Sequence, residues 1–141
     1  IVCYAPSVLI DQHGHATYLM PALLAEVVRL LELRVVAPTE SAAQATRTAF
    51  GSLIEESIWV EDPYQSSDYA EFFRRLLEAR IILPQSSLYV DVHPRRSIAA
   101  VRNGIYTGLF EDARRLYRDL GLWGVVPRES SLDEIEDHLC T

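Results

Sequence analysis

Two short units of this sequence carry side chains that could do chemistry together. Asp11-Gln12-His13-Gly14-His15 follows one apolar run, Asp91-Val92-His93 follows another, and they hold three of the four histidines. Carboxylates and imidazoles are common zinc ligands, and bound zinc lowers the pKa of its water to about 7. One hypothesis is therefore a metal-dependent hydrolase. Its metal ligands would be Asp11, His13, His15, Asp91 and His93, with Asp11, His13, Asp91 and His93 as the catalytic residues.

A second set of residues is suited to binding an anionic ligand. Arg95 and Arg96 follow Pro94, near the start of a helical stretch. A guanidinium can bind a phosphate or a carboxylate through two parallel hydrogen bonds. Glycine in the first unit would let a ligand approach the backbone closely. The expected ligand-binding residues are Gly14, His15, Thr17, Arg95 and Arg96. The alternative is that these residues form solvated loops.

The elements that must position these residues follow from the apolar pattern. Short apolar runs predict strands, and longer stretches with helical periodicity predict helices. Strands are expected at 1–4 (with an extension to 10), 34–37, 58–60, 87–92 and 123–126. Helices are expected at 17–33, from a cap at Thr39 or Ser41 to 53, at 68–80 after a cap at Ser66 or Ser67, at 97–120 and at 131–139.

This alternation predicts a three-layer α/β fold of the flavodoxin or Rossmann type. A mostly parallel sheet of four or five strands would carry helices on both faces. Ligands bind such sheets outside the carboxyl ends of the strands. Both Asp-x-His units follow predicted strands, so we expect them to face each other across one cleft. Because alternate residues of extended chain point the same way, Asp11, His13 and His15 would converge.

Composition bounds the class of protein. The 141 residues are expected to form one α/β domain, 1–141, which is either a whole protein or a fragment or half of a larger one. A net charge of −7 argues against nucleic acid or an anionic membrane as the main partner. No apolar run approaches the ~18 residues of a membrane span. Cys3 and Cys140 lie far apart in the sequence, and we expect reduced thiols in a cytoplasmic protein.

The first forty residues resemble the start of a retaining GT-B glycosyltransferase of the family-4 type. The resemblance rests on Tyr4-Ala5-Pro6-Ser7, Asp11, the loop His13–Tyr18, the helix after Pro21 and the strand ending at Pro38-Thr39. It implies a Rossmann-like half that binds a sugar or a nucleotide sugar beside the glycine loop. Two departures stand out: the usual Gly-Gly pair is His13-Gly14, and the donor-binding half with its Glu-x7-Glu signature is absent.

Three functions therefore remain open. The first is a ligand-binding domain of glycosyltransferase type, whose partner is a small molecule. The second is the hydrolase, which needs a divalent metal as cofactor and whose Asp-x-His-x-His spacing resembles the opening motif of amidohydrolases. The third is a non-catalytic regulatory or assembly domain, forming a homo-oligomer or binding a partner domain through the 97–120 helix. Whether the chain is an enzyme stays undecided at this point.

Overall fold

The computed structural model describes residues 1–55, 58–61, 68–126 and 132–140. One parallel sheet contains β1 (Val2–Tyr4), β2 (Arg34–Ala37), β3 (Ile58–Glu61), β4 (Leu88–Asp91) and β5 (Tyr106–Leu109). Across the sheet the order is β3-β2-β1-β4-β5. The predicted α/β class with a parallel sheet is confirmed.

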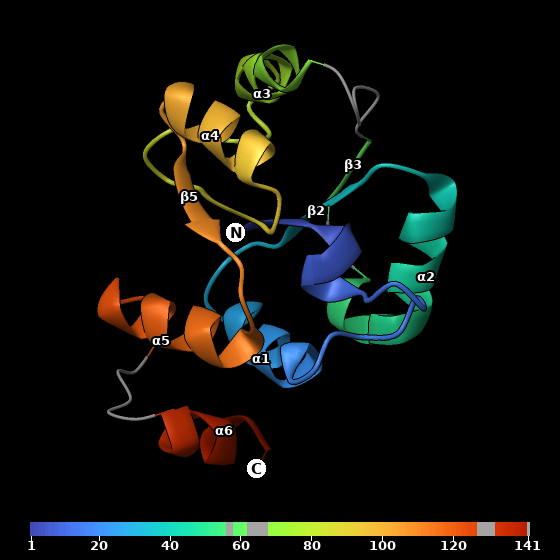
Figure 1. The fold of residues 1–141 in the computed structure, drawn as a ribbon, viewed down its shortest axis with the longest axis vertical. Coiled ribbons are helices and arrows are strands. Elements are labelled where there is room, and N and C mark those ends of the chain that lie inside the picture. The colour runs from blue at the N-terminus through green and yellow to red at the C-terminus, as the bar shows by residue number, and fades with distance from the viewer. Residues whose placement is uncertain (56–57, 62–67, 127–131, 141) are drawn as a thin grey trace.

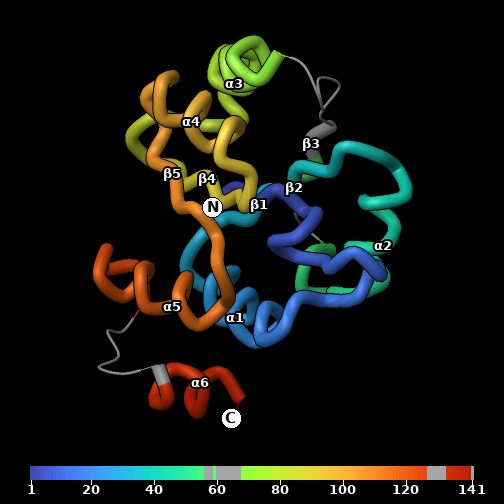
Figure 2. Tube along the Cα trace, in the orientation of Figure 1, coloured from blue at the N-terminus to red at the C-terminus, as the bar shows by residue number. Residues whose placement is uncertain are grey.

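Helices cover both faces of this sheet (Figure 1). One face carries α3 (Tyr69–Glu78) and α4 (Pro94–Arg102), and the other carries α1 (Met20–Val27), α2 (Glu40–Phe50) and α5 (Ala113–Leu122). The last helix, α6 (Leu132–Cys140), packs against α1 and α5 on the side away from the sheet (Figure 2). Within the described ranges, no helix has the length and apolar character that crossing a membrane requires.

Alternate strand residues face opposite helix layers, as the two-residue period of a strand requires. In β1, Cys3 packs into the core beneath α1 and α5, whereas Val2 and Tyr4 pack beneath α3 and α4. Burial raises the pKa of the Cys3 thiol to about 12. This thiol is therefore protonated at neutral pH and is a core side chain rather than a nucleophile. Cys3 and Cys140 are both free.

Short polar side chains begin several helices, as the sequence predicts. The Thr39 hydroxyl accepts a hydrogen bond from the N–H of Ala42 at 3.0 Å, and α2 starts at the next residue. Asp68 caps α3 by accepting from the N–H of Glu71 at 3.0 Å. The sequence predicted this cap at Ser66 or Ser67, which fall outside the described residues, and the observed cap is Asp68.

The helix predicted over 97–120 is wrong, because that segment contains α4, β5 and the start of α5. Gly104 has φ +79°, a left-handed conformation that stops α4. The next residues, Tyr106 and Thr107, favour strands and pair with β4. The fifth strand therefore lies here. The strand predicted at 123–126 is instead a turn, closed by the Val125 N–H donating to the Leu120 carbonyl at 2.8 Å.

The segment after β1 also differs from the prediction. Val8 and Leu9 are fully buried, but they lie in an irregular turn in which the Ile10 N–H donates to the Ala5 carbonyl at 3.1 Å. The extension of β1 to residue 10 is therefore wrong. A short apolar run indicates that residues are buried, but it does not by itself indicate a strand. The next helix is shorter than the predicted 17–33, because Leu19 has φ +64° just before α1.

Candidate functional site

The strand order places a topological switch point between β1 and β4. From β1 the chain crosses to β2 through α1 on one face, and from β4 it crosses to β5 through α4 on the other. In open α/β sheets, ligands bind outside the carboxyl ends of the strands at such a switch point. The segments 5–19 and 92–96 follow those two ends. They contain all the sequence-predicted site residues except Asp91, which ends β4.

Asp91 is fully buried, and protein donors already engage both of its oxygens. Its Oδ2 accepts from Arg96 Nε at 2.7 Å and from the Tyr89 hydroxyl at 2.5 Å. Its Oδ1 accepts from Arg96 Nη2 at 3.1 Å and from the His93 N–H at 3.0 Å. Burial, together with this carboxylate, raises the pKa of Tyr89 well above its ordinary value. The network joins the end of β4 to the first turn of α4.

Arg96 completes this buried network with an aromatic contact. Its guanidinium carbon lies 3.7 Å from the centre of the Tyr4 ring and 6.0 Å from that of Tyr69. A bidentate ion pair stacked on tyrosine holds the start of α4 against the ends of β1 and β4. Asp91 and Arg96, predicted as catalytic and ligand-binding residues, thus bind each other inside the protein.

His93 and Arg95 are the predicted residues on α4 with free polar groups. His93 caps α4, because its Nδ1 accepts from the Arg96 N–H at 3.2 Å. In neutral His93 the proton therefore sits on Nε2, which has no hydrogen-bond partner within the described residues. The Arg95 guanidinium is exposed and forms no ion pair in the described part of the chain. One ring N–H and one cation are available at the helix start.

The Asp11 unit is an exposed turn and not extended chain. Asp11 Oδ1 accepts from the N–H groups of His13 and His15, at 2.8 and 3.0 Å. These backbone hydrogen bonds, that of His15 first, lower the pKa of Asp11. The Gly14 N–H donates to the Asp11 carbonyl at 3.0 Å, and the φ of Gly14 is +78°. The prediction that Asp11, His13 and His15 converge from extended backbone is wrong. The segment is a turn, in which the Asp11 carboxylate binds the backbone N–H groups of the two histidines.

No group of three or more metal-ligating side chains comes together within the described residues. The imidazole centroids of His13 and His15 are 6.4 Å apart, and both side chains are exposed. Asp11 and Asp91 each bond to their own segment. The five residues of the metal hypothesis are therefore not gathered into one cluster.

Backbone strain marks the segment after β1. Ser7 and Leu19 have φ values of +67° and +64°, which residues with a side chain rarely adopt. Between them, the Thr17 Oγ1 is buried without a hydrogen-bond partner among the described residues. Such strained positions cluster at functional sites. Of these residues, the sequence singled out only Thr17, because positive φ at Ser or Leu has no sequence signature.

Sequence reasoning also missed the tyrosines of the site. Tyr89 and Asp91 are two residues apart in β4 and share a face, so their spacing alone could have indicated the pair. Tyr4 and Tyr69 come from different elements, and no local signal relates them to Arg96.

Comparisons of this chain with protein-family models, with curated proteins and with solved structures give no match.

Proposed function

We propose that this chain is a Rossmann-like ligand-binding domain of glycosyltransferase type, which takes a nucleotide sugar, or a sugar bearing a phosphate, at the carboxyl ends of β1 and β4. The observation that carries the proposal is the switch point, with Arg95 and His93 Nε2 at the start of α4 left without a partner by the described part of the chain. A phosphate is matched by a guanidinium, a ring N–H and the positive end of a helix. The resemblance of residues 1–40 to a glycosyltransferase supports a ligand that contains a sugar.

The buried Asp91–Arg96 pair supports the proposal as a positioning device. It ties the first turn of α4 to β4 and to Tyr4, so that the two residues flanking Pro94 are held on a rigid base. Binding groups on a fixed helix start lose less conformational freedom than groups on a free loop. Catalysis is not part of this proposal, and the chain is proposed only to bind.

The test is ligand-induced thermal stabilisation with UDP-glucose, UDP and inorganic phosphate as probes. A ligand that binds only the native state raises the free energy of unfolding by about 2.7 kcal/mol at 100 times its Kd. We expect UDP-glucose to raise the Tm of the wild type and to lose most of this effect in Arg95→Ala. The matched control is Arg29→Ala, which removes an exposed arginine that lies outside α4 and β5.

Two outcomes would contradict the proposal: no shift of Tm with any of these probes, or equal shifts in both arginine variants. Gly14→Val is a poorer probe, although it changes the glycine loop. At φ +78° a valine would be strained whether or not a ligand binds there. A lost response in that variant would therefore not separate binding from local unfolding.

The assembly alternative is favoured by a different observation, the apolar side chains exposed on both sides of β5. The proposed homo-oligomer contact then lies at β5 and α4 rather than along one long 97–120 helix. The hydrolase alternative has no comparable support, since the described residues contain no metal-ligating cluster.

A further inference from the structure

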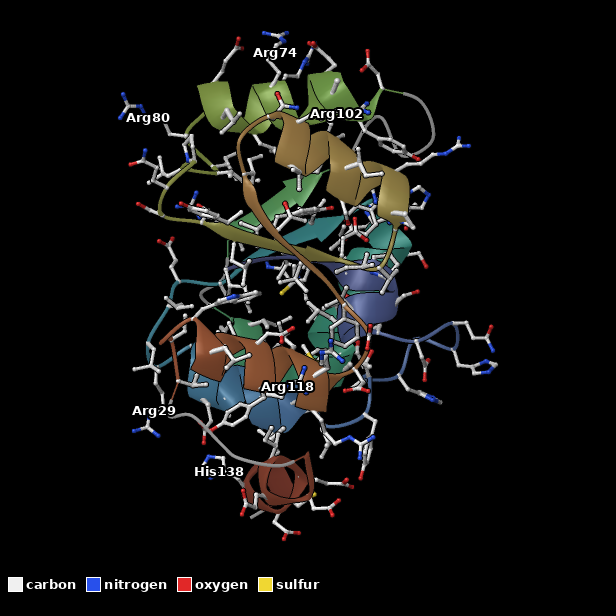
Figure 3. All side chains as sticks on the ribbon, turned by 60° about the vertical axis from the view of Figure 1, so that its left-hand side comes forward. Arg29, Arg74, Arg80, Arg102, Arg118 and His138 are labelled. Atoms are coloured by element: carbon white, nitrogen blue, oxygen red, sulfur yellow. The ribbon has the colours of Figure 1, made fainter. Side chains whose placement is uncertain are left out.

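β5 is an edge strand of the sheet, and the described residues give it none of the features that usually protect such an edge. It pairs with β4 on one side only, and its sequence Tyr-Thr-Gly-Leu contains no charge and no proline. Edge strands of monomeric proteins are normally blunted by charged residues, prolines, bulges or a covering segment, because their free backbone groups can pair with another chain. In Figure 3 this strand crosses in front of the rest of the sheet.

On the α4 side of β5, apolar side chains line a shallow groove. Val101 is 59% exposed and Leu109 is 54% exposed, and half-exposed Ile98 lies beside them. These three residues line a cavity of about 350 Å³ together with Ser97, Arg102 and Thr107. Ser97 is only 8% exposed, yet its Oγ has no hydrogen-bond partner among the described residues. The groove thus combines apolar walls with an unsatisfied hydroxyl.

The α5 side of β5 is apolar as well. Tyr106 is 64% exposed and Trp123 is 52% exposed, and both line a second cavity of about 570 Å³. The indole of Trp123 lies over Gly108, 3.6 Å from where a Cβ would stand. Apolar side chains therefore flank the free edge on both of its faces. A sheet that continues past β5 would need both faces covered, as parallel sheets in general do.

We propose that a second copy of this chain pairs with β5, antiparallel and about a two-fold axis, so that the two sheets become one. Such an axis makes the contact self-complementary, which is the commonest symmetry of soluble oligomers. The two α4 grooves would merge on one face of the joined sheet. The tyrosine and tryptophan side chains of the two copies would meet on the other face.

Charge complementarity favours a second copy as the occupant. Arg102, labelled in Figure 3, ends α4 just before β5, and it is exposed without an ion pair among the described residues. Glu111 lies just after β5, is 62% exposed, and reaches Arg115 only at 3.6 Å. Antiparallel pairing brings the start of one β5 to the end of the other. Each Arg102 then approaches Glu111 of the second copy, on both sides of the axis.

The test is the oligomeric state of the purified chain, measured by sedimentation velocity between about 1 and 100 µM, because dimer formation follows mass action. We expect a dimer in the wild type and monomers in Val101→Glu and Leu109→Glu, since each variant buries an unpaired charge in the contact. Leu30→Glu is the matched control, because Leu30 is an equally exposed leucine that is far from β5 in sequence and lines neither cavity. It should leave the dimer intact.

A charge exchange tests the antiparallel arrangement. Arg102→Glu and Glu111→Arg should each weaken the dimer by roughly tenfold, and the double variant should recover most of this loss. A monomeric wild type, or a dimer equally insensitive to Val101→Glu and Leu30→Glu, would overturn the proposed contact. A dimer that the double charge variant fails to restore would overturn the antiparallel pairing. Circular dichroism of each variant shows that it is folded.

Discussion

The two Asp-x-His units share a sequence pattern and a local geometry but differ in everything around them. In both, the aspartate Oδ1 accepts the N–H of the histidine two residues later, at 2.8 Å for Asp11 and 3.0 Å for Asp91. In the interior, Asp91 Oδ2 also accepts hydrogen bonds from the Arg96 guanidinium and from the Tyr89 hydroxyl. The second partner of Asp11 is the backbone of its own exposed turn.

The comparison shows that one short motif can serve two physical purposes. Exposed to water, the aspartate organises a loop, and its contribution competes with hydration. In the interior, the same carboxylate has lost its water and depends on a cation and a hydroxyl for compensation. Burial therefore decides which aspartate the fold requires, although the local pattern is the same.

The largest effect should come from removing the buried carboxylate. Asp91→Ala leaves Arg96 in the interior without its partner, and we expect a loss of about 3–5 kcal/mol in the free energy of unfolding. Urea denaturation of the variant and of Asp11→Ala measures the difference. We expect Asp11→Ala to lose far less, and the double variant Asp91→Leu, Arg96→Met to recover much of the loss. Equal losses of stability in Asp91→Ala and Asp11→Ala would contradict the claim that burial distinguishes the two aspartates.

A smaller effect should follow from changing the shape of the buried cation and keeping its charge. Arg96→Lys retains one positive charge but loses the two-pronged contact with Asp91 and the stacking on Tyr4. We expect a loss of about 1.5–3 kcal/mol, the range for hydrogen bonds to charged groups. Arg95→Lys is the matched control and should change stability by less than about 0.5 kcal/mol. Identical unfolding curves for the two variants would argue against the network.

Acid titration should reveal the exposed turn. The hydrogen bonds from the backbone of His15 and His13 hold the pKa of Asp11 below its ordinary value. Its ionised form therefore stabilises the fold above the unfolded pKa of about 3.9, and this contribution is lost as pH falls through the lower folded pKa. We expect the stability advantage of the wild type over Asp11→Asn to shrink below about pH 4. An advantage that is constant between pH 6 and pH 3, read from urea midpoints, would contradict this.

The smallest effects should come from the exposed imidazoles. His13→Ala and His15→Ala should each change the free energy of unfolding by no more than about 0.5 kcal/mol, as exposed loop substitutions usually do. Calorimetric titration with zinc tests directly whether these histidines bind a metal ion. The metal hypothesis requires a heat of zinc binding in the wild type that His13→Ala loses. We expect equal heats for both proteins.

Much of the architecture could be read from local patterns. The short apolar runs at 34–37, 58–60 and 87–92 match β2, β3 and β4 closely, because buried parallel strands are apolar on both faces. Thr39 predicted the start of α2 correctly, because its own hydroxyl accepts a hydrogen bond from the first turn of the helix. The sequence also located the Asp91 unit at the carboxyl end of a central strand, β4, whereas the Asp11 unit lies seven residues beyond the end of β1.

Where the sequence misled, the deciding interactions came from elsewhere in the chain. Residues 106–109 lie within the stretch predicted as one helix over 97–120, but they pair with the edge of β4 and form a strand. Burial of Val8 and Leu9 under the helices produced a strand-like run in an irregular turn. In the same way, nothing local to Arg96 indicates that it would stack on Tyr4, ninety-two positions away in the sequence.

The sequence by itself thus determined the α/β class and several helix starts, because these depend on periodicity and on neighbouring residues. Only the tertiary structure decided which aspartate is buried, which arginine is left free and which strand lies at the edge. Those properties depend on how strands and helices from distant parts of the chain exclude water from one carboxylate and leave another exposed.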